Sequence, residues 1–137
     1  STQTQAIQWV KDNLAPDDTI IIDAYAYVDL HDPAASPHVF ENAEIFWKVQ
    51  DDPIIRYGQF NNDWRTADYV MLTHEMSRQL LYNTQPLLKE ILEHVEPIAI
   101  FTNSPVPDDV SLATFFQTHQ AAAAILKVNK DEPDTTE

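Results

Sequence analysis

The chain contains no cysteine and only one glycine, Gly58, among its 137 residues. Without cysteine it forms no disulfide, carries no thiol nucleophile and holds no cysteine-based zinc site. Phosphate-binding loops and the nucleophile elbow of α/β-hydrolases need glycines where the backbone turns sharply or approaches a ligand closely. A single glycine disfavours both kinds of site.

Basic residues are also scarce, since 8 Lys and Arg stand against 22 Asp and Glu and give a formal net charge of −14. This balance argues against a nucleic-acid partner and against docking on anionic lipid, because both need a basic surface. No apolar run reaches the roughly 18 residues of a membrane span, and no signal peptide is visible. Because the chain opens with Ser1 and enters a predicted helix almost at once, we expect it to be a domain of a longer protein.

Hydrophobic residues make up 44% of the chain, which is enough for a buried core. We predict a single α/β domain over residues 1–128 and a flexible acidic tail over 129–137. Apolar residues three and four apart predict an opening helix that ends near Leu14, and the run Thr19–Ile22 is typical of a strand covered on both faces.

Helices and strands alternate through the rest of the chain. Further strands are predicted at 44–49, 67–72, 98–102 and 124–128, and further helices at 75–82, 86–95 and 108–119. This order predicts a mainly parallel sheet of about four or five strands with helices on both faces, a Rossmann-like three-layer fold. The segment 24–66 is expected to be an irregular, aromatic-rich insert after the first strand.

Acidic and histidine side chains offer few candidates for chemistry. His31 lies between Asp29 and Asp32, but no histidine pair has the spacing of a helical metal site, so no metal is predicted. Asp23 follows the first strand at the position where sheets of this type bind ligands. The alternative, which we favour, is that Asp23 caps the segment that follows it.

The aromatic residues of the insert are the most informative feature. Tyrosine, phenylalanine and tryptophan are interleaved with Lys48, Arg56 and Arg65. Aromatic faces beside charged donors are used to hold sugar rings and polar headgroups. A glycine-poor insert that needs large side chains for a small core of its own would give the same pattern.

Several short motifs in the first half of the chain come in a recognisable order. They are Ile21–Asp23, Tyr27–Leu30, Phe46–Val49 followed by Asp52-Pro53, Asp63–Arg65 and Asp68–Val70. In this order they resemble the extracytoplasmic C-terminal domain of bacterial membrane glycosyltransferases related to protein O-mannosyltransferases and aminoarabinose transferases, the GT-C family. The resemblance covers residues 5 to about 76. The chain departs from the family at Asp63, where a glycine often stands.

The resemblance implies a multi-span parent enzyme that moves a sugar from a polyprenyl-phosphate carrier to an acceptor outside the cytoplasm. Its catalytic carboxylate would lie in a membrane loop that this chain does not contain. No catalytic residue and no cofactor are therefore expected here. The chain would recognise the acceptor or cover the active site at the outer face of the bacterial membrane, with the membrane-embedded part of the same polypeptide as its partner and a glycan or lipid-linked sugar as its ligand.

A ligand on the insert would meet a defined set of side chains. Trp47 and Trp64 are predicted as stacking platforms, and Lys48 and Arg65 as donors to hydroxyls or a phosphate. The remaining candidates are Asp29 and Asp52 as orienting acceptors, with Tyr27 and Asp23 beside them. The alternative is that Lys48 or Arg65 pairs with Asp29 or Asp52 and fixes the insert on the sheet.

Two other functions compete with this interpretation. A stand-alone cell-wall or carbohydrate-binding module would use the same aromatic residues without a membrane parent. A small α/β hydrolase or deacetylase would instead need Asp23 and His31 to converge in one pocket.

Overall fold

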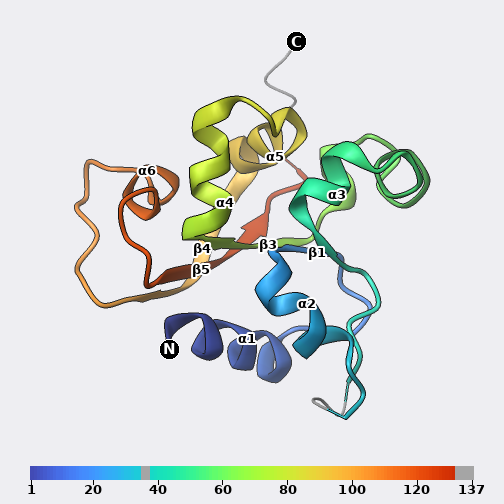
Figure 1. Cartoon of the computed structure of the whole chain (residues 1–137), viewed down its shortest axis with the longest axis horizontal. Coiled ribbons are helices and arrows are strands. Elements are labelled where there is room, and N and C mark those ends of the chain that lie inside the picture. Colours follow the sequence, from blue (N-terminus) through green and yellow to red (C-terminus); the bar gives the residue numbers. More distant parts are fainter. Residues whose placement is uncertain (35–37, 132–137) are drawn as a thin grey trace.

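In the computed structural model, which describes residues 1–34 and 38–131, five strands form one sheet in the order β2-β1-β3-β5-β4 (Figure 1). The strands are β1 (Ile20–Ile22), β2 (Ala43–Ile45), β3 (Tyr69–Thr73), β4 (Val95–Thr102) and β5 (Ala122–Val128). The α-helices are α1 (Thr2–Asn13), α2 (Ala24–His31), α3 (Phe46–Asp51), α4 (His74–Gln79), α5 (Pro86–Ile91) and α6 (Leu112–Phe116). Short helical segments of other types are η1 (Ile54–Gln59), η2 (Trp64–Thr66), η3 (Leu80–Tyr82) and η4 (Leu92–His94).

The predicted α/β fold with a sheet of four or five strands is confirmed, but the sheet is mixed and not mainly parallel. β1 runs parallel to β2 and to β3, whereas β5 is antiparallel to both β3 and β4. Thr102 at the end of β4 pairs with Ala122 at the start of β5. The intervening segment with α6 therefore returns the chain to the same end of the sheet, whereas a parallel connection has to cross the sheet's full length.

Local side-chain caps explain where most of the α-helices begin. Ser1, Asp23, Thr73 and Ser111 each accept a hydrogen bond from a backbone N–H in the first turn of the helix that follows. These bonds satisfy donors that have no partner inside the helix. Pro86 stands at the first position of α5, where its missing N–H costs nothing.

Alternate residues of the strands feed two apolar clusters on the two faces of the sheet. In β5, Ala124 and Leu126 belong to one cluster, while Ala123 and Ile125 belong to the other. The first cluster contains buried side chains of α3, α4, α5 and α6, and the second contains those of α1 and α2. Figure 1 shows α1 and α2 below the sheet and α4 and α5 above it.

The segment predicted as an irregular insert is more regular than expected. Residues 24–31 form α2, and the predicted strand at 44–49 is a strand only as far as Ile45. From Phe46 the chain is helical, and Phe46, Val49 and Gln50 are buried on one side of α3. Spacings of three and four residues are typical of a helix packed on a sheet, so tertiary packing overrides the β-branched and aromatic composition.

The second half of the chain follows the predicted order with shifted boundaries. The predicted helix at 86–95 is α5 followed by η4, and the helix at 108–119 shortens to α6. β4 begins at Val95 and runs through Pro97, with an irregularity in the pairing between Pro97 and Ala99. A proline is tolerated there because β4 is an edge strand.

The end of the described chain is attached to the domain. The Asn129 N–H donates to the His94 carbonyl at 2.7 Å, and Lys130 forms an ion pair with Asp68 at 2.5 Å. These contacts involve the first two residues of the predicted flexible tail, 129–137. Its remaining part, residues 132–137, lies outside the described residues.

Left-handed backbone conformations occur at asparagines. Asn61, Asn62 and Asn83 have φ values of 55°, 51° and 54°, whereas Gly58 does not have a positive φ. Asparagine tolerates this region because its short polar side chain bonds locally. The two consecutive asparagines turn the chain just before Trp64.

Candidate functional site

The candidate site lies at the carboxyl ends of the parallel strands. β1 stands between β2 and β3 in the sheet. The chain leaves β1 toward α2 on one face, whereas it leaves β2 and β3 toward α3 and α4 on the other. Neighbouring strands whose connections diverge in this way leave a crevice outside their carboxyl ends, where open α/β sheets bind ligands.

Asp23 stands at this edge but is engaged locally. Its side chain is 4% exposed, and Oδ1 accepts a hydrogen bond from the Ala26 N–H at 3.3 Å. The residue therefore caps α2, which was the alternative role considered for it.

A group of residues from α2, β2 and α3 meets at this edge, and we call it the Lys48 cluster: Tyr27, His31, Glu44, Trp47 and Lys48. The Lys48 ammonium lies 5.4 Å from the centre of the Tyr27 ring and 5.6 Å from that of Trp47. Both distances fall within the range of a cation–π interaction. The predicted ligand-binding residue Tyr27 thus shares one surface with two others, Trp47 and Lys48, which follow on a later helix.

His31 and Glu44 complete the Lys48 cluster, and neither was predicted as a binding residue. The His31 ring stacks on Tyr27 at 4.1 Å, and its Nε2–H donates to the Ala43 carbonyl at 2.7 Å. Glu44 is 8% exposed, and burial raises the pKa of its carboxyl. The charges of Lys48 and His31 oppose this rise in pKa, and that of Asp52 adds to it.

Trp47 also borders a groove between α3 and α4, which we call the Trp47 groove. Its volume is about 360 Å³, and it is lined by Phe46, Trp47, Asp51, Glu75, Gln79, Thr84 and Gln85. Trp47 is 44% exposed, so its indole is available from outside. Sequence reasoning missed the polar lining, although Glu75 and Gln79, four residues apart on a predicted helix, share one face.

Trp64 lies elsewhere, in the core, and Arg65 is half-buried beside it. Trp64 is 1% exposed and stacks on His94 with the ring centres 3.8 Å apart and the planes at 7°. The Arg65 guanidinium carbon lies 4.3 Å from the centre of the same indole. An external sugar ring cannot stack on Trp64 in this arrangement, so the structure does not bring Trp64 to the surface where it was predicted to act.

The two predicted acceptors have ordinary surroundings. Asp52 Oδ1 accepts from the Ile54 N–H at 3.0 Å, at the end of α3. Asp29 is half-buried on α2, two residues from Tyr27. In residues 1–34 and 38–131, no ion pair joins Lys48 or Arg65 to Asp29 or Asp52, so these pairs do not fix the insert on the sheet.

The hydrolase pair does not form. Asp23 caps the start of α2 and His31 is the last residue of that helix. At about 1.5 Å per residue, the two are separated by about 12 Å along the helix axis. A dyad within one water-bridge is excluded, and the hydrolase alternative loses its only named residues.

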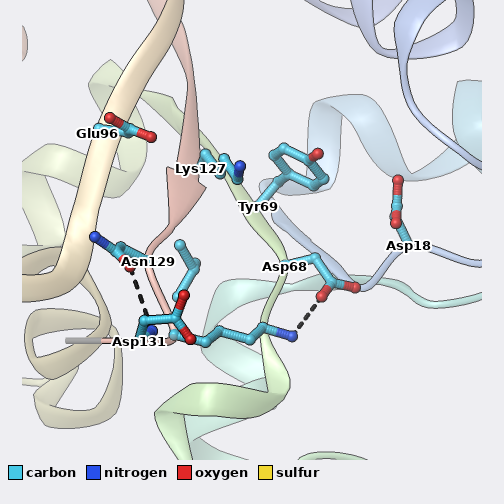
Figure 2. Close-up of a pocket in the computed structure, with 9 residues that line it drawn as sticks. Asp18, Asp68, Tyr69, Glu96, Lys127, Asn129 and Asp131 are labelled. Carbon is cyan, nitrogen blue, oxygen red and sulfur yellow. Dashed lines mark hydrogen bonds and ion pairs between the residues drawn. The ribbon is translucent and has the colours of Figure 1, made fainter. Parts of the chain in front are cut away.

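A second groove lies at the opposite end of the parallel strands (Figure 2). Its volume is about 370 Å³, and its charged lining includes Asp18, Asp68, Glu96, Lys127, Lys130 and Asp131. Burial raises the pKa of Asp18, and the neighbouring Asp68 and Asp17 raise it further. Burial also raises the pKa of Tyr69.

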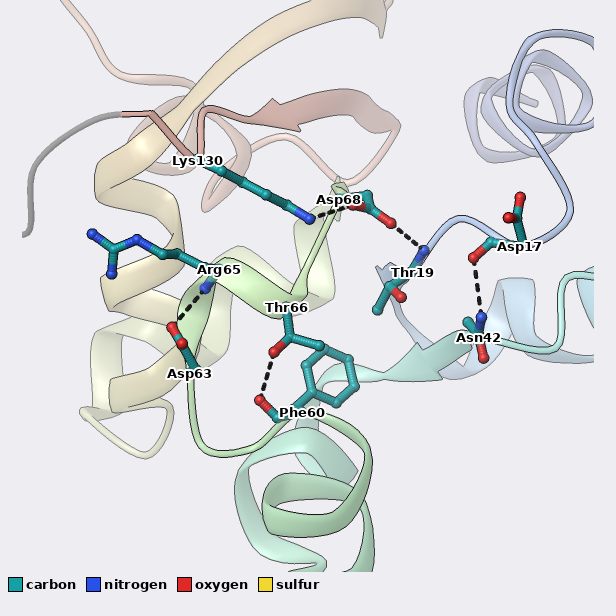
Figure 3. A network of polar contacts seen from close by, with 9 residues as sticks. All are labelled: Asp17, Thr19, Asn42, Phe60, Asp63, Arg65, Thr66, Asp68 and Lys130. Atoms are coloured by element: carbon teal, nitrogen blue, oxygen red, sulfur yellow. Dashed lines mark hydrogen bonds and ion pairs between the residues drawn. The ribbon is translucent and has the colours of Figure 1, made fainter.

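Asp68 acts as a structural junction in this groove (Figure 3). Its Oδ2 accepts from the Thr19 N–H at 2.7 Å, while Oδ1 pairs with Lys130. These contacts tie the start of β3 to the start of β1 and to the chain after β5. Among the residues that the structure describes, no group of three or more histidine or acidic side chains is placed to hold a metal ion.

Comparison with protein-family models, with curated proteins and with solved structures finds no match for this chain. In the described residues, the helices are all too short or too polar to cross a membrane.

Proposed function

We propose that this chain is the extracytoplasmic domain of a polyprenyl-phosphate-sugar-dependent membrane glycosyltransferase, non-catalytic alone, which presents the Lys48 cluster to the acceptor or to the membrane-embedded active site. The proposal includes a three-layer, Rossmann-like arrangement in which this cluster sits at the ligand-binding edge of the sheet. A glycan or a lipid-linked sugar is the ligand, and the membrane part of the same polypeptide is the partner.

One observation carries the proposal. Tyr27–Leu30 and Phe46–Val49 are among the motifs that resemble the glycosyltransferase domain, and they meet where the Lys48 ammonium lies over the Tyr27 ring. An ammonium between the exposed Trp47 ring and the half-buried Tyr27 ring suits a phosphate or hydroxyl group bound beside an apolar sugar face. The proposed enzyme family rests on the resemblance, and the proposed ligand class rests on the side chains of this surface.

The gene upstream of the Ser1 codon tests the membrane parent. We expect it to encode a series of apolar spans of about 20 residues in the same reading frame. A coding sequence that starts near Ser1 without such spans would overturn the proposal. In that case the carbohydrate-binding module is favoured, because the exposed Trp47 and its groove need no membrane part.

The role of the Lys48 cluster is tested in the full-length protein. We expect Trp47→Ala and Lys48→Ala to lower kcat/KM for sugar transfer from a polyprenyl-phosphate donor in membrane vesicles, because each removes part of the recognition surface. Tyr57→Ala is the matched control, since Tyr57 is exposed and lies outside the cluster. Equal rates for all these variants would remove the recognition role.

A further inference from the structure

The Trp47 groove combines an aromatic face with uncharged and acidic polar groups. Gln79 and Gln85 supply amides, Thr84 a hydroxyl, and Asp51 and Glu75 carboxylates, and no lysine or arginine lines the groove. Its volume of about 360 Å³ is that of a small-ligand cleft. An apolar platform with converging hydrogen-bond groups fits a ring with one apolar face and several hydroxyls.

Gln85 is the most unusual of these residues. Its side chain is 5% exposed, and Oε1 has no hydrogen-bond partner among the described residues. It precedes α5 without capping it, so the helix does not account for the position of the side chain. Because Oε1 itself has almost no accessible surface, a rotation of the amide toward the groove would let a ligand hydroxyl supply the missing donor.

The charges of the groove select the kind of ligand. Asp51 and Glu75 are acceptors for hydroxyl hydrogens and repel phosphate. The Gln79 side chain donates to Glu75 Oε1 at 3.3 Å, which leaves the Gln79 carbonyl oxygen as a further acceptor. A groove with this excess of acceptors favours a neutral polyol, which brings several donors.

We propose that the Trp47 groove binds a neutral hexopyranose ring, stacked on Trp47 and donating a hydroxyl hydrogen bond to Gln85. This inference rests on the proposed function and deepens it, because it assigns the sugar ring to the groove and leaves any phosphate to Lys48. The ring belongs to a glycan acceptor and not to the hexose phosphate of the donor, since the carboxylates disfavour the phosphate.

The test is a titration of the 137-residue chain with a panel of methyl hexopyranosides and, separately, with hexose 1-phosphates, followed by tryptophan emission and by ligand-observed NMR. We expect the methyl glycosides to bind and the hexose 1-phosphates to bind several-fold more weakly. Tighter binding of the phosphates would overturn the assignment of the groove to a neutral ring, as would no detectable binding of any glycoside.

Variants locate the binding. We expect Trp47→Ala to abolish it and Gln85→Leu to weaken it by about tenfold, the effect of one hydrogen bond. Tyr57→Ala and Gln117→Leu are matched controls outside the groove and should bind as the unmodified chain does. Because Trp47 is exposed, Trp47→Ala tests the site even if Gln85→Leu does not fold. Unchanged affinity in Trp47→Ala would overturn the inference.

The two proposals fail separately. Glycoside binding at the groove in a chain whose gene lacks membrane spans would retain the groove and remove the glycosyltransferase parent. Membrane spans in the gene without glycoside binding would do the reverse.

Discussion

Trp47 and Trp64 are each followed by a cation that lies over the indole ring, Lys48 at 5.6 Å and Arg65 at 4.3 Å. The two pairs nevertheless have opposite environments, because Trp47 is 44% exposed and Trp64 is 1% exposed. Trp64 fills the core between η2 and η4, whereas Trp47 borders an open groove. The same pair of residue types therefore stabilises the fold in one place and presents a surface in the other.

The largest expected effect comes from removing the buried ring. Trp64→Ala should lower the free energy of unfolding by about 3–5 kcal/mol, because it empties a large core volume and removes the stack on His94. Urea denaturation measures this loss, and Trp64→Phe should recover part of it. A loss as small as about 0.5 kcal/mol, typical of a surface position, would contradict the assignment to the core.

The two cations should show the same contrast, with Arg65 contributing more to the free energy of unfolding than Lys48. Arg65→Ala should lower the free energy of unfolding by about 1 kcal/mol, because the guanidinium covers a buried ring. Lys48→Ala should lower it by less, since its rings are partly solvated. Arg65→Lys keeps the charge and loses the planar stack, so it should fall between Arg65→Ala and the unmodified chain. A larger loss for Lys48→Ala than for Arg65→Ala would reverse the comparison.

Glu44 lies beside Lys48 of the exposed pair, and its titration should make the stability of the chain depend on pH. Its folded-state pKa is raised above 4.5, so its contribution to stability is fully present below pH 4.5 and is lost as the pH rises through the raised value. Glu44→Gln should therefore be more stable than the unmodified chain near pH 7, and the difference should shrink below about pH 4.5. Urea unfolding across about pH 4–8 measures this.

Lys48→Gln sharpens the same experiment. Without the cation, the pKa of Glu44 should rise further, so the loss of stability should be larger and should extend to a higher pH. The raised pKa of Asp18 is common to all three chains and cancels in their differences. A difference between Glu44→Gln and the unmodified chain that does not change with pH would show that Glu44 titrates normally.

The smallest expected effect on stability comes from the exposed ring. Trp47→Ala should change the free energy of unfolding by no more than about 0.5 kcal/mol. It should remove much of the emission that acrylamide quenches, whereas the emission of Trp64 should be protected. Strong quenching that persists in Trp47→Ala and disappears in Trp64→Phe would mean that the two environments are exchanged.

The sequence predicted best where one local rule decided the structure. The β-branched run Ile20–Ile22 is the buried strand β1, and Asp23 caps the helix after it, because both follow from neighbouring residues. Phe46 was assigned to a strand and is helical, since its composition suits both states and packing against the sheet decides. The antiparallel β5 depends on the path of residues 103–121, which no local pattern specifies.

The candidate site divides in the same way. The aromatic and cationic members, Tyr27, Trp47 and Lys48, were predicted from their residue types. Their separation from Trp64 was not predictable, because burial is a property of the folded chain. Gln85 joins Trp47 only through the packing of α5 beside α3, and an isolated glutamine before a proline gives no signal in the sequence.

The asparagines with positive φ also affect the denatured state of the chain. Glycine loses more backbone freedom on folding than any other residue, and proline has little to lose. With Asn61, Asn62 and Asn83 at left-handed positions, one glycine and nine prolines, the denatured ensemble of this chain is narrower than that of a glycine-rich chain of equal length. Part of the native state's stability therefore arises from the low conformational entropy of the denatured state, not from contacts within the fold.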